Sequence, residues 1–264
     1  MQVKLRFLSF AIAANISTAP IAASPTIYIA SDSTVQTYSP EHYPQAGWGQ
    51  MLRCALKPGI ALSNQAMAGR STKTFIEEGR LDRIAQEIKR GDTLLIQFGH
   101  NDADHRKGRY ADPQSAYRDN LIKMIQVARS VGAQPVLITP VIRRHFVDGQ
   151  VRADFAPWSQ EVRTLAAEER VPLIDLEALS GAWIQKLGEA GSKPYYLHYT
   201  AEDHTVGFPK GIDDDTHFSE IGARAIAKIV ASRLRVMHLP VSRYILRNPP
   251  GLDRTTPLGS TACD

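Results

Sequence analysis

Four short segments of the sequence carry side chains that together could cleave an ester. A serine hydrolase needs a nucleophile, a base within hydrogen-bond reach, a carboxylate that orients the base, and N–H donors aimed at the developing oxyanion. The side chains and backbone positions that could fill these roles are Ser33, Gly69, Asn101, Asp214 and His217. Their order along the chain is therefore the first indication of chemistry in this sequence.

Each segment taken alone has a simpler interpretation. Ser33 could be a turn residue or a helix cap, and Asn101 could close an Asx-turn. Gly69 could mark a tight turn, where glycine tolerates backbone conformations that other residues avoid. The acids from Asp213 to Asp215 could form a solvated turn or bind a hard cation such as calcium. The joint order of the segments favours catalysis over these alternatives.

Apolar runs that precede the chemical residues predict buried strands. Each run is too continuously apolar to alternate between core and solvent, which is typical of parallel strands covered on both faces. We expect strands over residues 26–30, 60–64, 93–98, 135–139 and 172–175. Because these runs alternate with helical periods, the sequence predicts an α/β fold, a three-layer sandwich around a five-stranded, mostly parallel sheet. Ligand crevices in such sheets lie at the carboxyl ends of the strands.

Two amphipathic helices are predicted beside the sheet. The first begins after Asp112, whose carboxylate can cap free N–H groups, and ends at Gly132. Its inner face is expected to hold Tyr117, Leu121, Met124, Ile125 and Ala128. The second covers about 219–238 with Ser219 as its cap. Its inner face is expected to hold Ile221, Ala225, Ile229 and Val230. A long loop over 188–215 and the tail after Leu239 lie outside this repeat.

The first residues have the pattern of an export signal. The apolar run 7–16 follows Lys4 and Arg6 and leads into small residues, so we expect cleavage near Ala23. A membrane anchor is the weaker alternative, because a spanning helix needs about 20 apolar residues. We therefore expect 1–23 to be a signal peptide, 24–240 a single hydrolase domain and 241–264 a C-terminal tail. The protein is then secreted or periplasmic, and not bound to a membrane after cleavage.

Charge and cysteine content narrow the partners. The formal net charge of +4 falls by two, to +2, when Lys4 and Arg6 are removed, and no basic cluster stands out. This argues against a nucleic-acid partner. Cys54 and Cys263 are the two cysteines. They could pair in an oxidising compartment or remain apart, since distance decides pairing, and two cysteines exclude a cysteine-based zinc cluster.

The order of serine, glycine, Gly-x-Asn-Asp and Asp-x-x-His resembles the SGNH hydrolases, also called GDSL esterases, over nearly the whole of the chain after the signal. The resemblance implies a flavodoxin-like sheet with the site at its C-terminal edge. It also implies Ser33 as nucleophile, His217 as base and Asp214 as the orienting carboxylate. Oxyanion donors would come from Ser33, Gly69 and Asn101. No metal or organic cofactor is needed for this chemistry.

Four stretches narrow the resemblance to the rhamnogalacturonan acetylesterase branch: Ser31 to Thr34, Gly47 to Gln50, Ala68 to Ser71 and Asp215 to Phe218. That resemblance implies a carbohydrate O-acetylesterase that removes acetyl groups from rhamnogalacturonan, a pectin, through an acyl-enzyme. Its partner would be an acetylated polysaccharide or oligosaccharide, while the oligomeric state is left open. The wider family has glycine at the position of Ser31, a departure that does not touch the nucleophile.

Substrate contacts are less specific in the sequence. Trp48, Arg70 and Tyr199 are candidates, with packing, a surface charge and a core-covering role as their respective alternatives. Two other functions compete with a sugar deacetylase. A lipid-directed SGNH esterase or thioesterase would keep the triad beside an apolar acyl groove. A non-catalytic carbohydrate-binding protein would keep only the fold, but the presence of all five catalytic-type residues disfavours it.

Overall fold

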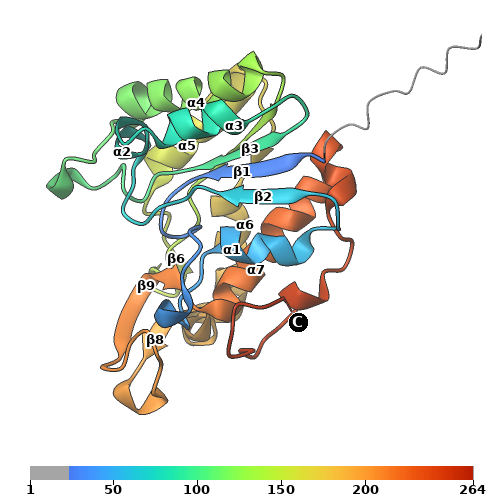
Figure 1. Ribbon diagram of the computed structural model, residues 1–264. Coiled ribbons are helices and arrows are strands. Elements are labelled where there is room, and N and C mark those ends of the chain that lie inside the picture. The colour runs from blue at the N-terminus through green and yellow to red at the C-terminus, as the bar shows by residue number, and fades with distance from the viewer. Residues whose placement is uncertain (1–23, 264) are drawn as a thin grey trace, which may run out of the picture.

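The computed structural model describes residues 24–263 and contains a five-stranded sheet between two layers of helices (Figure 1). The predicted signal peptide, residues 1–23, lies outside the described residues. All neighbouring strands pair in parallel, in the order β2-β1-β3-β4-β7. The strands are β1 (Thr26–Ala30), β2 (Ala61–Asn64), β3 (Thr93–Gln97), β4 (Gln134–Ile138) and β7 (Leu173–Ile174). The predicted α/β sandwich with a flavodoxin-like strand order is confirmed.

Helices cover both faces of this sheet (Figure 1). One face carries α1 (Trp48–Leu52), α6 (Leu176–Ser192) and α7 (Glu220–Val236). The other carries α2 (Thr72–Glu77), α3 (Arg80–Glu87), α4 (Arg118–Ser130) and α5 (Ala156–Glu168). Each layer forms its own apolar cluster against the sheet, which is why the strands are apolar on both sides. Within residues 24–263, none of the helices is both long and apolar enough to cross a membrane.

Shorter elements connect these layers. The 3-10 turns are Pro40–His42, Arg53–Ala55, His105–Lys107, Lys193–Tyr195, Ala201–Asp203, Pro240–Tyr244 and Pro250–Leu252. A π-type turn, Pro113–Tyr117, precedes α4. Two small antiparallel ribbons pair β5 (Phe146–Val147) with β6 (Gln150–Val151), and β8 (Tyr196–Tyr199) with β9 (Ile212–Phe218). The predicted loop over 188–215 is therefore partly wrong, because it contains β8 and most of β9.

The predicted helices form with the expected caps. Asp112 accepts a hydrogen bond from the N–H of Gln114 at 3.1 Å, and Ser219 accepts one from the N–H of Gly222 at 3.3 Å. All five apolar residues expected on the inner face of α4 and its leading turn are buried. In α7 the prediction was half wrong. Ala225 and Ile229 are only partly buried, because the helix turns a different stripe toward the core, formed by Ile221, Ala223, Ile226, Ala227, Val230 and Leu234.

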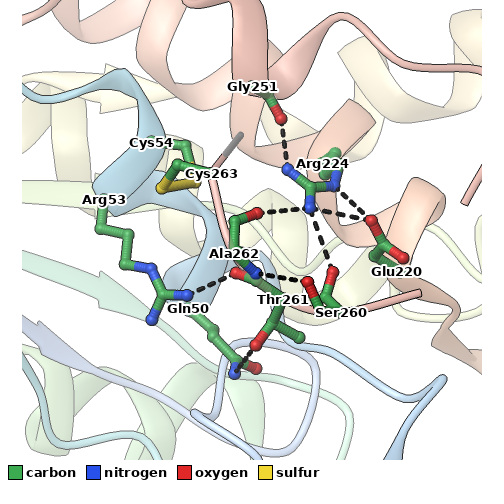
Figure 2. Close-up of a disulfide and its surroundings, with 10 residues drawn as sticks. All are labelled: Gln50, Arg53, Cys54, Glu220, Arg224, Gly251, Ser260, Thr261, Ala262 and Cys263. Carbon is green, nitrogen blue, oxygen red and sulfur yellow. Dashed lines mark hydrogen bonds and ion pairs between the residues drawn. A yellow bond between two sulfur atoms is a disulfide. The ribbon is translucent and has the colours of Figure 1, made fainter. Parts of the chain in front are cut away.

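The C-terminal tail packs against the helical layer that contains α1, α6 and α7. Cys54 and Cys263 form a disulfide, which resolves the alternative that the sequence left open. Figure 2 shows the fully buried guanidinium of Arg224 beside it, paired with Glu220 at 2.8 Å. The same guanidinium donates to tail carbonyls, those of Gly251, Ser260 and Ala262. Tail side chains such as Leu252 join the core cluster of the domain, while the division of the chain at residue 240 stays a prediction.

Candidate active site

Three of the predicted residues form a continuous hydrogen-bonded chain. Nε2 of His217 lies 2.8 Å from Oγ of Ser33, and Nδ1 of His217 lies 2.7 Å from Oδ2 of Asp214. Ser33 follows the carboxyl end of β1, whereas Asp214 and His217 both lie on β9. These distances suit proton transfer from a hydroxyl to an imidazole whose far side is held by a carboxylate.

Asp214 is arranged to remain an anion. Burial alone would raise its pKa, but hydrogen bonds and charge from His217, with backbone N–H groups, lower that pKa to about 2. Its Oδ1 accepts the N–H of Thr216 at 2.6 Å and that of His217 at 3.0 Å. With Oδ2 facing Nδ1, the imidazole carries its proton on Nδ1 and leaves Nε2 free to accept the proton of Ser33.

The loop that carries Ser33 is fixed on several sides. Ser31 donates its hydroxyl to the carbonyl of Gln97 at 2.6 Å, so serine at this position ties β1 to β3 where the wider family has glycine. Asp32 accepts hydrogen bonds from the N–H and the hydroxyl of Thr34 at 2.9 and 2.8 Å. The hydroxyl of Tyr38 donates to the carbonyl of Ser33 at 2.8 Å. The nucleophile therefore stands on a rigid turn.

Of the three expected oxyanion donors, Gly69 and Asn101 lie in two loops that are bonded to each other. The side-chain amide of Asn101 donates one N–H to the carbonyl of Arg70 at 2.9 Å and has a second N–H to offer. Gly69 has φ of +78°, a left-handed conformation that suits glycine. Within residues 24–263 the backbone N–H groups of Ser33 and Gly69 donate to no protein acceptor. These donors are thus free for an oxygen atom of a substrate.

Asp102, the residue after Asn101, bonds to Thr72 and so joins the segments that follow β3 and β2. Its Oδ1 accepts the N–H of Thr72 at 2.9 Å and the hydroxyl of Thr72 at 2.6 Å, and the hydroxyl in turn accepts from Asn120 at 3.1 Å. The carboxyl group is fully buried, and burial raises its pKa to about 7 against the opposing effect of the bonds from Thr72. The loop after β2 is thereby anchored to the loop after β3, next to Asn101.

A cleft of about 550 Å³ opens over these groups. From the predicted set it is lined by Ser33, Asn101 and His217. Most of the other lining residues were not among the predicted site residues: His100, Arg106, Arg109, Arg143 and Phe155. These residues lie in the connections that follow β3, β4 and β6, and their position after strands was the one signal available in the sequence.

The three candidates for substrate contact do not line this cleft. The proposed role of Trp48 is wrong, because the side chain is fully buried and its indole N–H bonds to Oε1 of Gln97 at 3.0 Å. The guanidinium of Arg70 is turned to Glu78 at 3.0 Å. Tyr199 lies half-buried in the β8–β9 ribbon. In each case packing or surface pairing, the alternative interpretation, describes the observed position.

The acids beside Asp214 have partners of their own. Asp213 bonds to Nδ1 of His198 at 2.5 Å, and Asp215 bonds to Nε2 of the same ring at 2.8 Å. Arg144 also pairs with Asp215 at 2.7 Å. Across residues 24–263, no three His, Cys, Asp or Glu side chains are grouped as ligands for a metal ion. These contacts join β8 to β9 and connect β9 to the segment after β4.

Comparisons with known proteins agree with this geometry. A family model described as GDSL-like lipase/acylhydrolase matches residues 31–230. The chain is similar to the probable rhamnogalacturonan acetylesterase YesY of Bacillus subtilis (strain 168), with 41% identity over 222 residues, 84% of this chain and 97% of the relative. It is also similar to the rhamnogalacturonan acetylesterase RhgT of that bacterium, with 38% identity over 221 residues, 83% and 94% of the two chains.

Solved structures give the same assignment of the fold. Protein YXIM_BACsu from Bacillus subtilis matches with a TM-score of 0.68 and 28% identity over 80% of this chain, which spans 56% of that protein. Axe2, an acetylxylan esterase from Geobacillus stearothermophilus, matches with a TM-score of 0.56 and 17% identity over 80% and 93% of the two chains, a likeness of fold alone. The chain therefore belongs to the GDSL-like lipase/acylhydrolase family and is a serine carboxylic ester hydrolase.

Proposed function

We propose that this enzyme is a carbohydrate O-acetylesterase that removes acetyl groups from rhamnogalacturonan. The observation that carries the proposal is the hydrogen-bonded chain from Ser33 through His217 to Asp214, which opens into a cleft lined mostly by polar and charged residues. The substrate is suggested by the two Bacillus relatives named as rhamnogalacturonan acetylesterases, whose lengths the chain nearly covers. A lipid-directed esterase would instead need an apolar groove, and arginine side chains line this cleft.

In the first half of the proposed reaction, Oγ of Ser33 attacks the acetyl carbonyl carbon while Nε2 of His217 takes the hydroxyl proton. Asp214 stabilises the imidazolium that forms. The carbonyl oxygen becomes an oxyanion that accepts hydrogen bonds from N–H groups of Ser33, Gly69 and Asn101. The tetrahedral intermediate then collapses, the bond between the carbonyl carbon and the sugar oxygen breaks, and His217 returns its proton to that oxygen. The sugar leaves with a free hydroxyl, and the acetyl group remains on Ser33.

The second half repeats this sequence with water. Nε2 of His217 takes a proton from water as the water oxygen attacks the acetyl carbonyl of the acyl-enzyme. When the second intermediate collapses, Oγ of Ser33 leaves and recovers a proton from His217. Acetate is released, and the enzyme returns to its starting state with no net change in protons on the triad.

We also propose that the enzyme works outside the cytoplasm, secreted or in the periplasm. The signal pattern of residues 1–23 and the disulfide between Cys54 and Cys263 support this proposal, since disulfides persist in oxidising compartments. N-terminal sequencing of the protein recovered from the medium or periplasm tests it. A new N-terminus near Ser24 is expected, and full-length protein retained in the cytoplasm would contradict the proposal.

The decisive experiment measures acetate release from acetylated rhamnogalacturonan and from acetylated xylan. The wild type, Ser33→Ala and Ser232→Ala are compared, because Ser232 is an exposed serine on α7 that serves as a matched control. We expect rhamnogalacturonan to be the better substrate, Ser33→Ala to be inactive with an unchanged melting temperature, and Ser232→Ala to match the wild type. Retained turnover in Ser33→Ala would refute the nucleophile. A series of 4-nitrophenyl esters tests the lipid alternative, which faster cleavage of octanoyl than acetyl esters would favour.

A further inference from the structure

Three arginines give the active-site cleft an excess of positive charge. Arg106 and Arg109 come from the connection between β3 and α4, and Arg143 comes from the connection between β4 and β5. All three line the same cleft as Ser33 and His217. None of them takes part in the mechanism above, so their presence beside the reacting atoms calls for another role.

Among the described residues that line the cleft, Asp104 is the one carboxylate that opposes Arg106 and Arg109. Asp104 bonds through Oδ1 to Nε of Arg106 at 3.0 Å and through Oδ2 to Nη2 of Arg109 at 2.6 Å. The hydrogen bond from Arg106, followed by the contact with Arg109, holds the pKa of Asp104 well below its ordinary value. A single negative charge is thus shared by two guanidinium groups, which leaves one positive charge in excess.

The donors of Arg106 remain available to a ligand. Its side chain is 86% exposed, and its bond to Asp104 uses Nε rather than the terminal nitrogens. Arg109 has a different position, since its side chain is largely buried and its Nη1 also donates to the carbonyl of Gly69 at 3.2 Å. Arg109 therefore supplies charge and rigidity to the wall, while Arg106 presents free N–H groups.

Arg143 is also only loosely paired. Its Nη1 lies 3.7 Å from Oδ2 of Asp154, beyond hydrogen-bond distance, and its side chain is 41% exposed. The other oxygen of Asp154 bonds to Nδ1 of His145 at 2.6 Å, so this carboxylate is already shared. The planar fork of an arginine is best satisfied by two oxygens of one carboxylate. The fork of Arg143 is not satisfied in this way by the protein itself.

We propose that Arg106 and Arg143 bind the carboxylate of a uronic acid residue in the acetylated sugar chain, in the field of Arg109. This inference rests on the proposed function and deepens it, because it selects acidic polysaccharides over neutral ones such as xylan. The cleft volume of about 550 Å³ falls within the range of small-ligand sites. A carboxylate held there places the acetyl ester of the same or the adjoining sugar near Ser33.

The test uses one backbone in two charge states. Acetylated rhamnogalacturonan oligosaccharides with free carboxylates are compared with the same oligosaccharides after methyl esterification, and acetate release gives kcat and KM for each. The wild type is expected to prefer the free acid through a lower KM. Arg143→Gln and Arg106→Gln should each reduce that preference roughly tenfold, mainly in KM, because a charge-assisted hydrogen bond is lost. Added NaCl should weaken binding of the free acid alone.

Arg235→Gln is the matched control, since Arg235 is an exposed arginine in the last turn of α7 and does not line the cleft. It should keep the wild-type preference. Equal kcat/KM for the free acid and the methyl ester in the wild type, or an unchanged preference in both cleft variants, would overturn the inference. In that case acetate release from the sugars would still uphold the proposed function. Turnover of 4-nitrophenyl acetate without release of acetate from any sugar would instead refute the proposed function.

Discussion

Replacing Asp214 by asparagine should disable the base by reversing its tautomer. Oδ1 of Asp214 accepts two backbone N–H groups, whereas Oδ2 faces Nδ1 of His217. The carbonyl oxygen of an asparagine will occupy the Oδ1 position, because an NH₂ group there would face two donors. The NH₂ group then donates to Nδ1, the ring proton moves to Nε2, and the ring cannot accept the proton of Ser33.

The size of the effect follows from the bonds that the productive orientation would break. Flipping the amide leaves two N–H groups unpaired at about 1–3 kcal/mol each, or about 2–6 kcal/mol in total. This corresponds to a loss of roughly 30-fold to 3 × 10⁴-fold in kcat. The kcat is measured with 4-nitrophenyl acetate, and ¹⁵N NMR of His217 reports the tautomer, which should change from Nδ1–H to Nε2–H.

Asp213→Asn is the control for this experiment, because its carboxylate is 90% exposed and bonds to His198 rather than to His217. It should retain the wild-type kcat within about twofold. An Asp214→Asn enzyme that keeps kcat within tenfold of the wild type and still shows the Nδ1–H tautomer would contradict this prediction. Asp214 would then have no part in orienting the base.

Three further predictions concern the oxyanion donors, the buried acid and the tail. Asn101→Ala should lower kcat by about 10²–10³ with little change in KM for small acetyl esters, as steady-state kinetics will show. Because the pKa of buried Asp102 is raised to about 7, the folded state binds its proton more tightly than the unfolded state does. The free energy of unfolding should therefore fall by about 1 kcal/mol per pH unit between about pH 4 and 7. Urea unfolding should show this decline, and Asp102→Asn should lack it; equal slopes would contradict the assignment. Replacing both Cys54 and Cys263 by serine should lower the free energy of unfolding by about 2–5 kcal/mol, and an unchanged urea midpoint would mean that the cross-link adds nothing.

The strands and the edge that holds the site could be predicted because burial on both faces leaves a plain signal. A run such as Thr26–Ala30 has four consecutive buried residues after its threonine, and its limits agree with the structure. Once the strands are known to be parallel, their carboxyl ends meet at one edge, so Ser33 and Asn101 must approach each other. The resemblance implied the partnership of Asp214 and His217, and the 2.7 Å contact shows that the two side chains meet.

The local geometry of that pair could not be predicted. We expected a loop up to residue 215 and a helix from about 219, but Asp214 and His217 lie on β9, where backbone N–H groups bond to Asp214 within the strand. β9 pairs with β8, and His198 on β8 bonds to Asp213 on β9. In the sequence, the acids around Asp213 are typical of a solvated turn. Such cross-strand contacts leave no periodic pattern, which is why this segment was expected to be a loop.

Whether a residue lines the cleft also depends on its contacts with residues far away in the sequence. Trp48 was a candidate for substrate contact with packing as the alternative, and its indole N–H bonds to Gln97, 49 residues away, inside the core. Arg106 and Arg143 bear no fixed spacing to Ser33, because they come from separate connections after β3 and β4. Loop side chains of this kind are assembled by the tertiary fold, and the sequence offers only their position after a strand.

The contacts of the C-terminal tail determine when the active site becomes complete during synthesis. The side chain of Gln50 binds both backbone groups of Tyr38, the residue whose hydroxyl supports the carbonyl of Ser33. Gln50 in turn contacts Thr261, which the ribosome adds 211 residues later (Figure 2). A nascent chain that already contains His217 therefore still lacks one support of its nucleophile. We expect the emerging polypeptide to gain full esterase activity only when the tail has docked.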